Sequence, residues 1–192
     1  MADTDSDQGT RILVVDDERE VADAYALRLR GECAVETAYG GQEALSMVED
    51  RTVDIVLLDR HMPDISGDEV LETLNERGFR GRVVMVTAID PGFDVLDLPF
   101  DDYLCKPVDR ADIRSAVDHQ RQVLAYETLG EYFSAKSTET VLASQTSSEQ
   151  RENHEEFAAV RERASRLERR SRRLLDDETV VAEFADINRD GR

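Results

Sequence analysis

Lysine is almost absent from this chain of 192 residues: of its 24 basic residues, only Lys106 and Lys136 are lysines. Aspartate and glutamate together number 43, so the formal net charge is −19. An acidic, lysine-poor surface is typical of proteins that work at high ionic strength, where salt screens the repulsion between like charges. An acidic protein from a GC-rich genome would show the same bias, and the sequence leaves both origins open. Lys106 stands out because arginine is used almost everywhere else.

Long apolar runs are also missing. No stretch of about 18 apolar residues occurs, so we expect no membrane span. The first residues, Met1 to Asp7, are acidic and lack an apolar core, which argues against a signal peptide. The two cysteines, Cys33 and Cys105, match no metal-ligand spacing. We expect both to be small, unpaired core residues of a protein in a reducing cytoplasm.

Strand and helix patterns alternate from Arg11 onward, after an acidic leader at residues 1–10 that we expect to be disordered. Five strand–helix units of this size indicate an α/β fold with a doubly wound parallel sheet, in a domain covering residues 11–126. Between Thr87 and Tyr103, two prolines and a glycine leave room for only about two helical turns, so the fourth helix should be short. The predicted strands are Arg11–Val15, Ala34–Ala38, Ile55–Leu58, Val83–Val86 and Asp102–Cys105.

The alternation stops after Tyr126, and residues 127–192 are expected to form a second, α-helical domain. Helices are predicted at about 127–143 and 149–175, with a Ser/Thr-rich break at 144–148. In the second helix, apolar or small residues recur at alternating steps of three and four, which is the seam of a helix that pairs with another helix. A hairpin within the chain and a coiled-coil dimer both fit this seam. Its residues are Phe157, Val160, Ala164, Leu167, Ser171 and Leu174.

Chemically active side chains follow four of the predicted strands. They are Asp16 with Asp17, then Asp59, Thr87 and Lys106. Taken singly, such residues are often helix caps or turn residues. Because the carboxyl ends of parallel strands meet in one crevice, all of them are expected to converge. Three clustered carboxylates repel one another unless a hard cation lies among them, so the pattern predicts a Mg²⁺ site for phosphoryl chemistry.

At these positions the chain resembles the receiver domain of two-component response regulators. The resemblance covers about residues 11–126 and rests on the acidic pair, on a D-x-x-M-P-x-x-x-G loop at 59–67, on the hydroxyl of Thr87 and on a Tyr-x-x-Lys-Pro sequence that begins at Tyr103. It implies a flavodoxin-like fold with strand order 2-1-3-4-5. It also implies a sensor histidine kinase as partner and no enzymatic activity beyond self-catalysed phosphotransfer and dephosphorylation.

The resemblance assigns roles to individual residues. Asp59 corresponds to the phosphoacceptor, and Asp16, Asp17, Asp59 and the backbone carbonyl of His61 correspond to the Mg²⁺ ligands. A carboxylate that attacks phosphorus needs its negative charge offset, which agrees with this arrangement.

The remaining receiver residues contact or sense the phosphoryl group. Thr87 corresponds to the hydroxyl that hydrogen-bonds it and Lys106 to the lysine that pairs with it. Thr87 and Tyr103 correspond to the pair of switch residues, although an aromatic residue on an edge strand is also common for structural reasons alone. Pro107 follows Lys106 as in the family, where this peptide bond is usually cis.

The C-terminal part resembles the helical HalX domain of haloarchaeal response regulators, a family described as transcriptional regulators. Residues 161–173 hold seven arginines and two glutamates, a net charge of +5. This patch either contacts nucleic-acid phosphates or is a charged flank that meets acidic side chains. No helix-turn-helix or zinc spacing supports sequence-specific DNA binding. The candidate nucleic-acid contacts are Arg166, Arg169, Arg170 and Arg173.

The sequence therefore predicts a cytoplasmic response regulator of a phosphorelay with a helical output module. A homodimer through 111–126 or 149–175 would serve as output, and so would DNA binding or protein contacts alone. The alternative from another class is a Mg²⁺-dependent phosphohydrolase of the haloacid-dehalogenase type. That class requires Asp-x-Asp after the first strand, whereas here the strand is followed by Asp16, Asp17 and Glu18.

Overall fold

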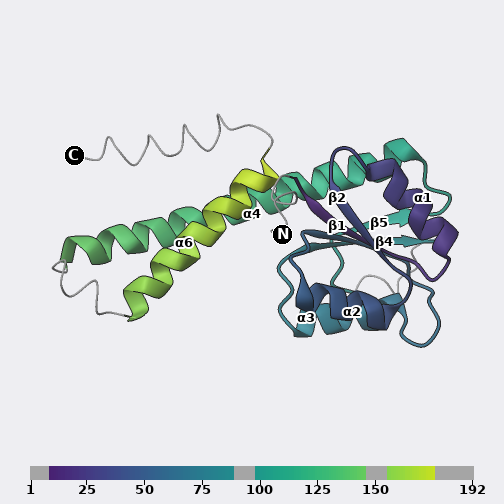
Figure 1. Ribbon diagram of the computed structural model, residues 1–192, viewed down its shortest axis with the longest axis horizontal. Coiled ribbons are helices and arrows are strands. Elements are labelled where there is room, and N and C mark those ends of the chain that lie inside the picture. Colours follow the sequence, from purple (N-terminus) through teal and green to yellow (C-terminus); the bar gives the residue numbers. More distant parts are fainter. Residues whose placement is uncertain (1–8, 89–97, 146–154, 176–192) are drawn as a thin grey trace, which may run out of the picture. The chain divides into compact units, whose positions relative to one another are not determined.

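The computed structural model describes residues 9–88, 98–145 and 155–175 (Figure 1). The chain divides into two compact units, residues 1–121 and 122–192. None of the described helices is long and apolar enough to cross a membrane.

A five-stranded parallel sheet forms the centre of the first unit, with strand order β2-β1-β3-β4-β5. The sheet order and the parallel pairing confirm the predicted fold class. Thr87 proves to be the last residue of its strand, because that strand is one residue longer at each end than predicted. The strands are β1 (Arg11–Val15), β2 (Ala34–Ala38), β3 (Ile55–Leu58), β4 (Arg82–Thr87) and β5 (Asp102–Cys105).

Helices cover both faces of this sheet, with α1 on one face and α2 and α3 on the other (Figure 1). The described helices are α1 (Arg19–Leu29), α2 (Gly41–Asp50), α3 (Gly67–Glu76), α4 (Arg110–Gln145) and α6 (Glu155–Leu174). The first half of α4 packs on the same face as α1. The predicted short fourth helix falls largely on residues 89–97, which lie outside the described residues.

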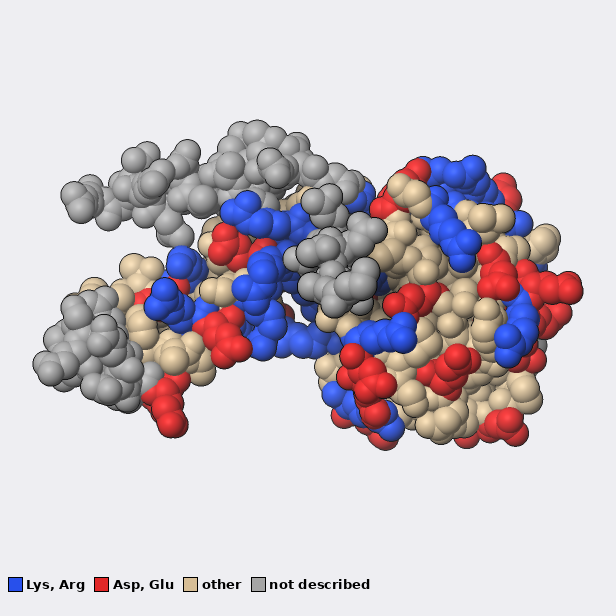
Figure 2. Space-filling model, viewed as in Figure 1, with Lys and Arg blue, Asp and Glu red and all other residues tan. Residues whose placement is uncertain are grey.

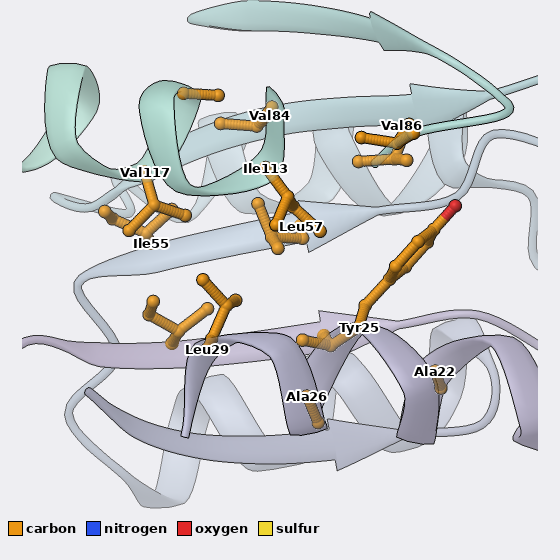
Figure 3. Packing of buried hydrophobic residues seen from close by; sticks show 14 residues of the cluster. Ala22, Tyr25, Ala26, Leu29, Ile55, Leu57, Val84, Val86, Ile113 and Val117 are labelled. Atoms are coloured by element: carbon orange, nitrogen blue, oxygen red, sulfur yellow. The ribbon is translucent and has the colours of Figure 1, made fainter. Parts of the chain in front are cut away.

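Each central strand serves two separate cores, because successive side chains point to opposite faces of a sheet. Even-numbered residues of β1 and β4 and odd-numbered residues of β3 pack with α1 and α4 (Figure 3). Their sequence neighbours pack with α2 and α3. Burial on both faces explains why these strands are continuous apolar runs instead of alternating patterns.

Helices α4 and α6 form an antiparallel pair in the second unit. Tyr132 and Ala135 of α4 cluster with Ala164 and Leu167 of α6. Where α4 enters the second unit, Leu124 and Ala125 cluster with Leu174 and Leu175 at the other end of α6. Four of the six predicted seam residues, Ala164, Leu167, Ser171 and Leu174, are buried. The seam is therefore occupied within the chain, as in the hairpin alternative.

Two expectations need correction, and one helix is slightly longer than expected. Helix α4 runs unbroken from Arg110 to Gln145, so its last two residues fall in the predicted Ser/Thr-rich break, the rest of which lies outside the described residues. Cys105 is exposed instead of buried in the core, since it lies at the end of the edge strand β5, and Cys33 is only partly buried. Thr10, assigned to the disordered leader, is buried, and its carbonyl accepts a hydrogen bond from the Ala34 amide.

The two-sided burial of β3 gives a testable prediction. Leu57 is 1% exposed in the core shared with α1 and α4, whereas Leu27 on α1 is 66% exposed. Leu57→Ala is expected to lower the free energy of unfolding by about 2–5 kcal/mol, because it leaves a cavity. Leu27→Ala should change it by less than about 0.5 kcal/mol. Urea denaturation at one fixed salt concentration measures both, and equal losses would contradict the described core.

Candidate functional site

The polar side chains predicted to converge do lie at one edge of the sheet. Asp16 follows β1 directly, Asp59 follows β3, Thr87 ends β4 and Lys106 follows β5. Main-chain hydrogen bonds continue the sheet into this edge: the Asp59 amide donates to Val15 O over 2.9 Å, and the Lys106 amide donates to Thr87 O over 2.7 Å. The backbone of the sheet thus fixes where each side chain begins.

One ammonium group joins two of the three carboxylates. Lys106 Nζ lies 2.8 Å from Asp16 Oδ2 and 2.9 Å from Asp59 Oδ1. The second oxygen of each carboxylate accepts a backbone amide: Glu18 N donates to Asp16 Oδ1 over 3.0 Å, and His61 N donates to Asp59 Oδ2 over 3.1 Å. Asp16 and Asp59 are only 2% and 6% exposed, so this is a nearly buried charge cluster held by hydrogen bonds on all four oxygens.

Burial and the ammonium act on the ionisation of the cluster in opposite directions. Burial raises the pKa of Asp59, and the hydrogen bond from Lys106 offsets only part of this rise. Burial also lowers the pKa of Lys106, but its hydrogen bonds to Asp16 and Asp59 outweigh that effect and leave it raised. Lys106 therefore stays protonated, while the Asp59 carboxylate is poorly solvated and unusually basic.

The loop after β3 is held against the start of α3 by contacts that need a glycine. A Cβ atom on Gly67 would lie 2.2 Å from the Asp59 carbonyl oxygen, and the Gly67 amide donates to Arg60 O over 2.9 Å. The Arg60 guanidinium adds three hydrogen bonds of 3.1 Å to Asp68. Ser66 caps α3, with Glu69 completing a capping box. These contacts determine the conformation of the main chain that carries Asp59.

The acidic cluster has the donor set of a hard divalent cation. Asp16, Asp17 and Asp59 can each offer a carboxylate oxygen such that all three atoms lie within 4.8 Å of one another. Oxygen ligands of this kind suit Mg²⁺, which binds through a few carboxylates and keeps several waters. Asp17 is the most exposed of the three, so water can reach the site from its side. The residues present fit a Mg²⁺ ion.

The other predicted receiver residues take different positions. Thr87 is fully buried at the end of β4. Tyr103 lies on β5 opposite Met85, is partly buried and packs against the ring of Phe100 at a centroid distance of 5.6 Å. For His61 the structure shows the backbone amide donating to Asp59, a contact that the sequence did not predict. The Lys106–Pro107 peptide bond is cis, as the resemblance implied.

The predicted arginine patch lies on α6, where Figure 2 shows basic side chains gathered. Arg166 and Arg169 are exposed, and Arg170 and Arg173 are partly buried. Two neighbouring arginines meet acidic side chains: Arg163 lies 3.5 Å from Glu131 of α4, and Arg172 lies 3.0 Å from Glu168. Part of the patch is thus a charged flank of the helix pair, and part of it faces solvent.

Two residues of α1 border the site and were not predicted. Figure 3 shows the Tyr25 ring rising from α1 toward Val86. Burial raises the pKa of the Tyr25 hydroxyl, and the positive charge of Lys106 opposes this rise. Arg28 Nη1 donates to Val108 O over 2.6 Å and so ties α1 to the loop that carries Lys106. No local pattern in the sequence links either residue to the loop that carries Lys106.

The sheet order and the acid cluster at the carboxyl ends of the strands are those of a flavodoxin-like fold with a ligand site at this edge. The family model of the response regulator receiver domain matches residues 12–118, which is more than half of the chain. The chain therefore belongs to the response regulator receiver family. The HalX domain model matches residues 122–189. This match confirms the predicted resemblance of the C-terminal part to the HalX domain.

Curated relatives agree with both parts. A Haloferax volcanii protein named "Putative transcriptional regulator" is 43% identical over 184 residues, which is 86% of this chain and 31% of the relative. The transcriptional regulatory protein CutR of Streptomyces coelicolor is 42% identical over 101 residues, covering 50% of this chain and 46% of CutR. The chain thus spans less than half the length of these relatives.

Solved structures agree with the fold of the first unit. A CheY-like receiver domain protein from Methanospirillum hungatei superposes with a TM-score of 0.58 at 27% identity, over 62% of this chain and 99% of that chain. A signal receiver domain from Vibrio parahaemolyticus gives a TM-score of 0.61 at 23% identity, over 64% and 98%.

The two lysines of the chain allow a matched test of the charge cluster. Lys106→Met is expected to lower the free energy of unfolding by about 1–3 kcal/mol at neutral pH, because it leaves two nearly buried carboxylates without their shared donor. Lys136 pairs with Glu139 at 2.8 Å near the surface, so Lys136→Met should cost less than about 0.5 kcal/mol. Denaturation in a metal-free buffer measures both. Equal stability of the two variants would contradict a structural role for the Lys106 ammonium.

Proposed function

We propose that the chain is a response regulator that accepts a phosphoryl group on Asp59 from a sensor histidine kinase. The observation that carries this proposal is the contact between the Lys106 ammonium and Asp59 Oδ1 at 2.9 Å, in a cluster with two further acids. A basic, poorly solvated carboxylate beside a fixed positive charge suits nucleophilic attack on an anionic phosphoryl donor.

In the proposed transfer, an oxygen of the Asp59 carboxylate attacks phosphorus as the bond between phosphorus and the donor's histidine nitrogen breaks. Lys106 offsets the charge on the phosphoryl oxygens. The His61 amide, which lies 3.1 Å from Asp59 Oδ2, helps to orient the carboxylate. The product is an acyl phosphate on Asp59, which water later hydrolyses.

Asp16, Asp17 and Asp59, together with the backbone carbonyl of His61, would hold the Mg²⁺ ion. When bound, the ion supplies positive charge that offsets the charge on the transferring group. The chain's own contribution is to keep three acids within reach of one cation and to keep Lys106 protonated between two of them.

The signal leaves the site through Thr87 and Tyr103 in this proposal. Thr87 ends the strand next to β5, and Tyr103 lies on β5 itself. A hydroxyl drawn toward the phosphoryl oxygens would free space into which the Tyr103 ring turns. Catalysis is limited to self-phosphorylation and dephosphorylation, and the protein works in the cytoplasm beside its kinase.

The output is regulation of transcription through the helical C-terminal unit. The names of the Haloferax and Streptomyces relatives support this step, and so does the HalX match. Within that unit, the solvent-facing Arg166 and Arg169 and their neighbours Arg170 and Arg173 are the candidates for contact with nucleic-acid phosphates.

Two variants of the same loop test the phosphoacceptor. Incubation with Mg²⁺ and acetyl phosphate should add one base-labile phosphate to the wild type and none to Asp59→Asn. Asp64→Asn is the matched control, because Asp64 is exposed and has a φ of 65°, a conformation that asparagine tolerates. Intact-protein mass spectrometry counts the phosphates. Labelling of Asp59→Asn would move the nucleophile elsewhere, and sustained release of phosphate from simple phosphomonoesters would favour the phosphohydrolase instead.

Metal binding is tested separately from phosphorylation. Mg²⁺ at a hundredfold excess over its Kd should stabilise the wild type by about 2.7 kcal/mol. Asp17→Asn should lose most of this gain, and Asp64→Asn should keep it. Thermal melting at fixed ionic strength measures the effect, since added salt by itself screens the acidic cluster. The same Mg²⁺ response in Asp17→Asn and wild type would contradict the metal site.

A further inference from the structure

An uncharged face runs along the second half of α4. It consists of Tyr126, Gly130, Phe133, Ser137, Val141 and Ser144, which recur at steps of three and four. On a helix these positions fall within an arc of about 80° and extend over about 27 Å. The charged residues of this half of α4 all lie outside that arc; they are Glu127, Glu131, Lys136 and Glu139. In a chain in which 35% of residues are charged, such a face is unusual.

The uncharged face points away from α6. The α4 residues that cluster with α6 include Leu124, Ala125 and Ala135, which lie on the opposite side of the helix. Tyr126 is 67% exposed and Val141 is 51% exposed, and these are two of the three large hydrophobic side chains exposed in the described part of the chain. The face thus presents two exposed apolar side chains with no charge between them. Phe133, which lies between them, is partly buried and packs against the ring of Tyr132 at a centroid distance of 5.3 Å.

No contact among the described residues explains the glycine at position 130. It lies inside a helix, where glycine is less favourable than alanine by about 1 kcal/mol. A Cβ atom on Gly130 would meet no described atom within 4 Å, so no contact in that part of the chain requires the absence of a side chain. A glycine at an exposed helix position is useful where another backbone or a large side chain approaches closely.

We propose that the uncharged face of α4 binds the same face of a second copy of this chain, with the two helices antiparallel. In that arrangement a twofold axis passes near residue 135, and each large side chain meets a small one. Val141 faces Gly130 of the other copy, Phe133 faces Ser137, and Tyr126 faces Ser144. This complementarity within one face is what an isologous dimer requires, and it accounts for Gly130.

The charge of the chain sets a condition for this occupant. Two copies that each carry −19 repel one another over most of their surfaces, and an uncharged stripe is where they can meet. Salt screens the remaining repulsion. Association should therefore become tighter as salt rises, whereas phosphate contacts to nucleic acid weaken with salt.

Gly130→Arg separates the interface from the fold. Arginine is a better helix former than glycine, and no described atom lies within 4 Å of a Cβ at this position, so the variant should melt at or above the wild-type temperature. It also lowers the net negative charge, which would favour nonspecific association. It should nevertheless raise the dimer Kd by at least about tenfold, because a bulky charge replaces the site that receives Val141. Gly130→Ala, which adds a single Cβ at the same place, should weaken the dimer by less than Gly130→Arg does. Thr138→Arg, which lies outside the face, should leave the dimer unchanged.

Sedimentation velocity of the full chain without phosphodonor, over a KCl series from about 0.2 to 3 M, decides the proposal. A reversible monomer–dimer equilibrium that tightens with salt and is lost in Gly130→Arg supports it. A monomer under all conditions overturns it, and so does a dimer that Gly130→Arg leaves intact. If the full chain is monomeric and a chain ending at Leu175 dimerises, residues 176–192 cover the face and the second copy is not its occupant.

Disulfide trapping tests the direction of the two helices in a Cys33→Ser, Cys105→Ser background. Mixing the Gly130→Cys and Val141→Cys variants should give crosslinked dimers that contain one chain of each. Crosslinking of Gly130→Cys with itself, at the same rate as in the mixture, would show a parallel pair and overturn the antiparallel arrangement.

Discussion

The structure of the receiver unit's functional edge depends on one ammonium group between two nearly buried carboxylates. Lys106 Nζ contacts Asp16 and Asp59, which directly follow β1 and β3, while the Lys106 amide donates to the carbonyl of the last residue of β4. A single residue after β5 therefore connects the ends of the three central strands. Without it, two acids would lie close together in a poorly solvated place, where each would favour protonation of the other.

The same contact explains an exception in the composition. Only two of the 24 basic residues are lysines, and all the others are arginines with a planar guanidinium. A guanidinium is a rigid fork suited to two oxygens of one carboxylate. The site instead needs one compact charge that reaches oxygens of two different carboxylates, at 2.8 and 2.9 Å. Lysine provides that geometry, and a general preference for arginine does not extend to this position.

The sequence predicted the sheet well because each central strand is an apolar run bounded by polar residues, and the strand ends then placed Asp16, Asp59 and Lys106 together. Other features depend on tertiary contacts that have no local pattern. The hydrogen bond from Arg28 to Val108 and the position of Tyr25 beside the site belong to this group. The seam of α6 was visible as a period of three and four, but a period does not identify the partner helix.

The division of the core by the sheet has a consequence for how this fold changes over evolutionary time. The backbone of β1, β3 and β4 is a wall between two packed volumes, one shared with α1 and α4 and the other with α2 and α3. A larger side chain at Leu57 has to be compensated by a smaller one on its own side of the wall, while Val56 and Leu58, its sequence neighbours, are free to vary with α2 and α3. Side chains in each of the two cores can therefore be substituted independently of the other core, while the main chain of the sheet stays the same.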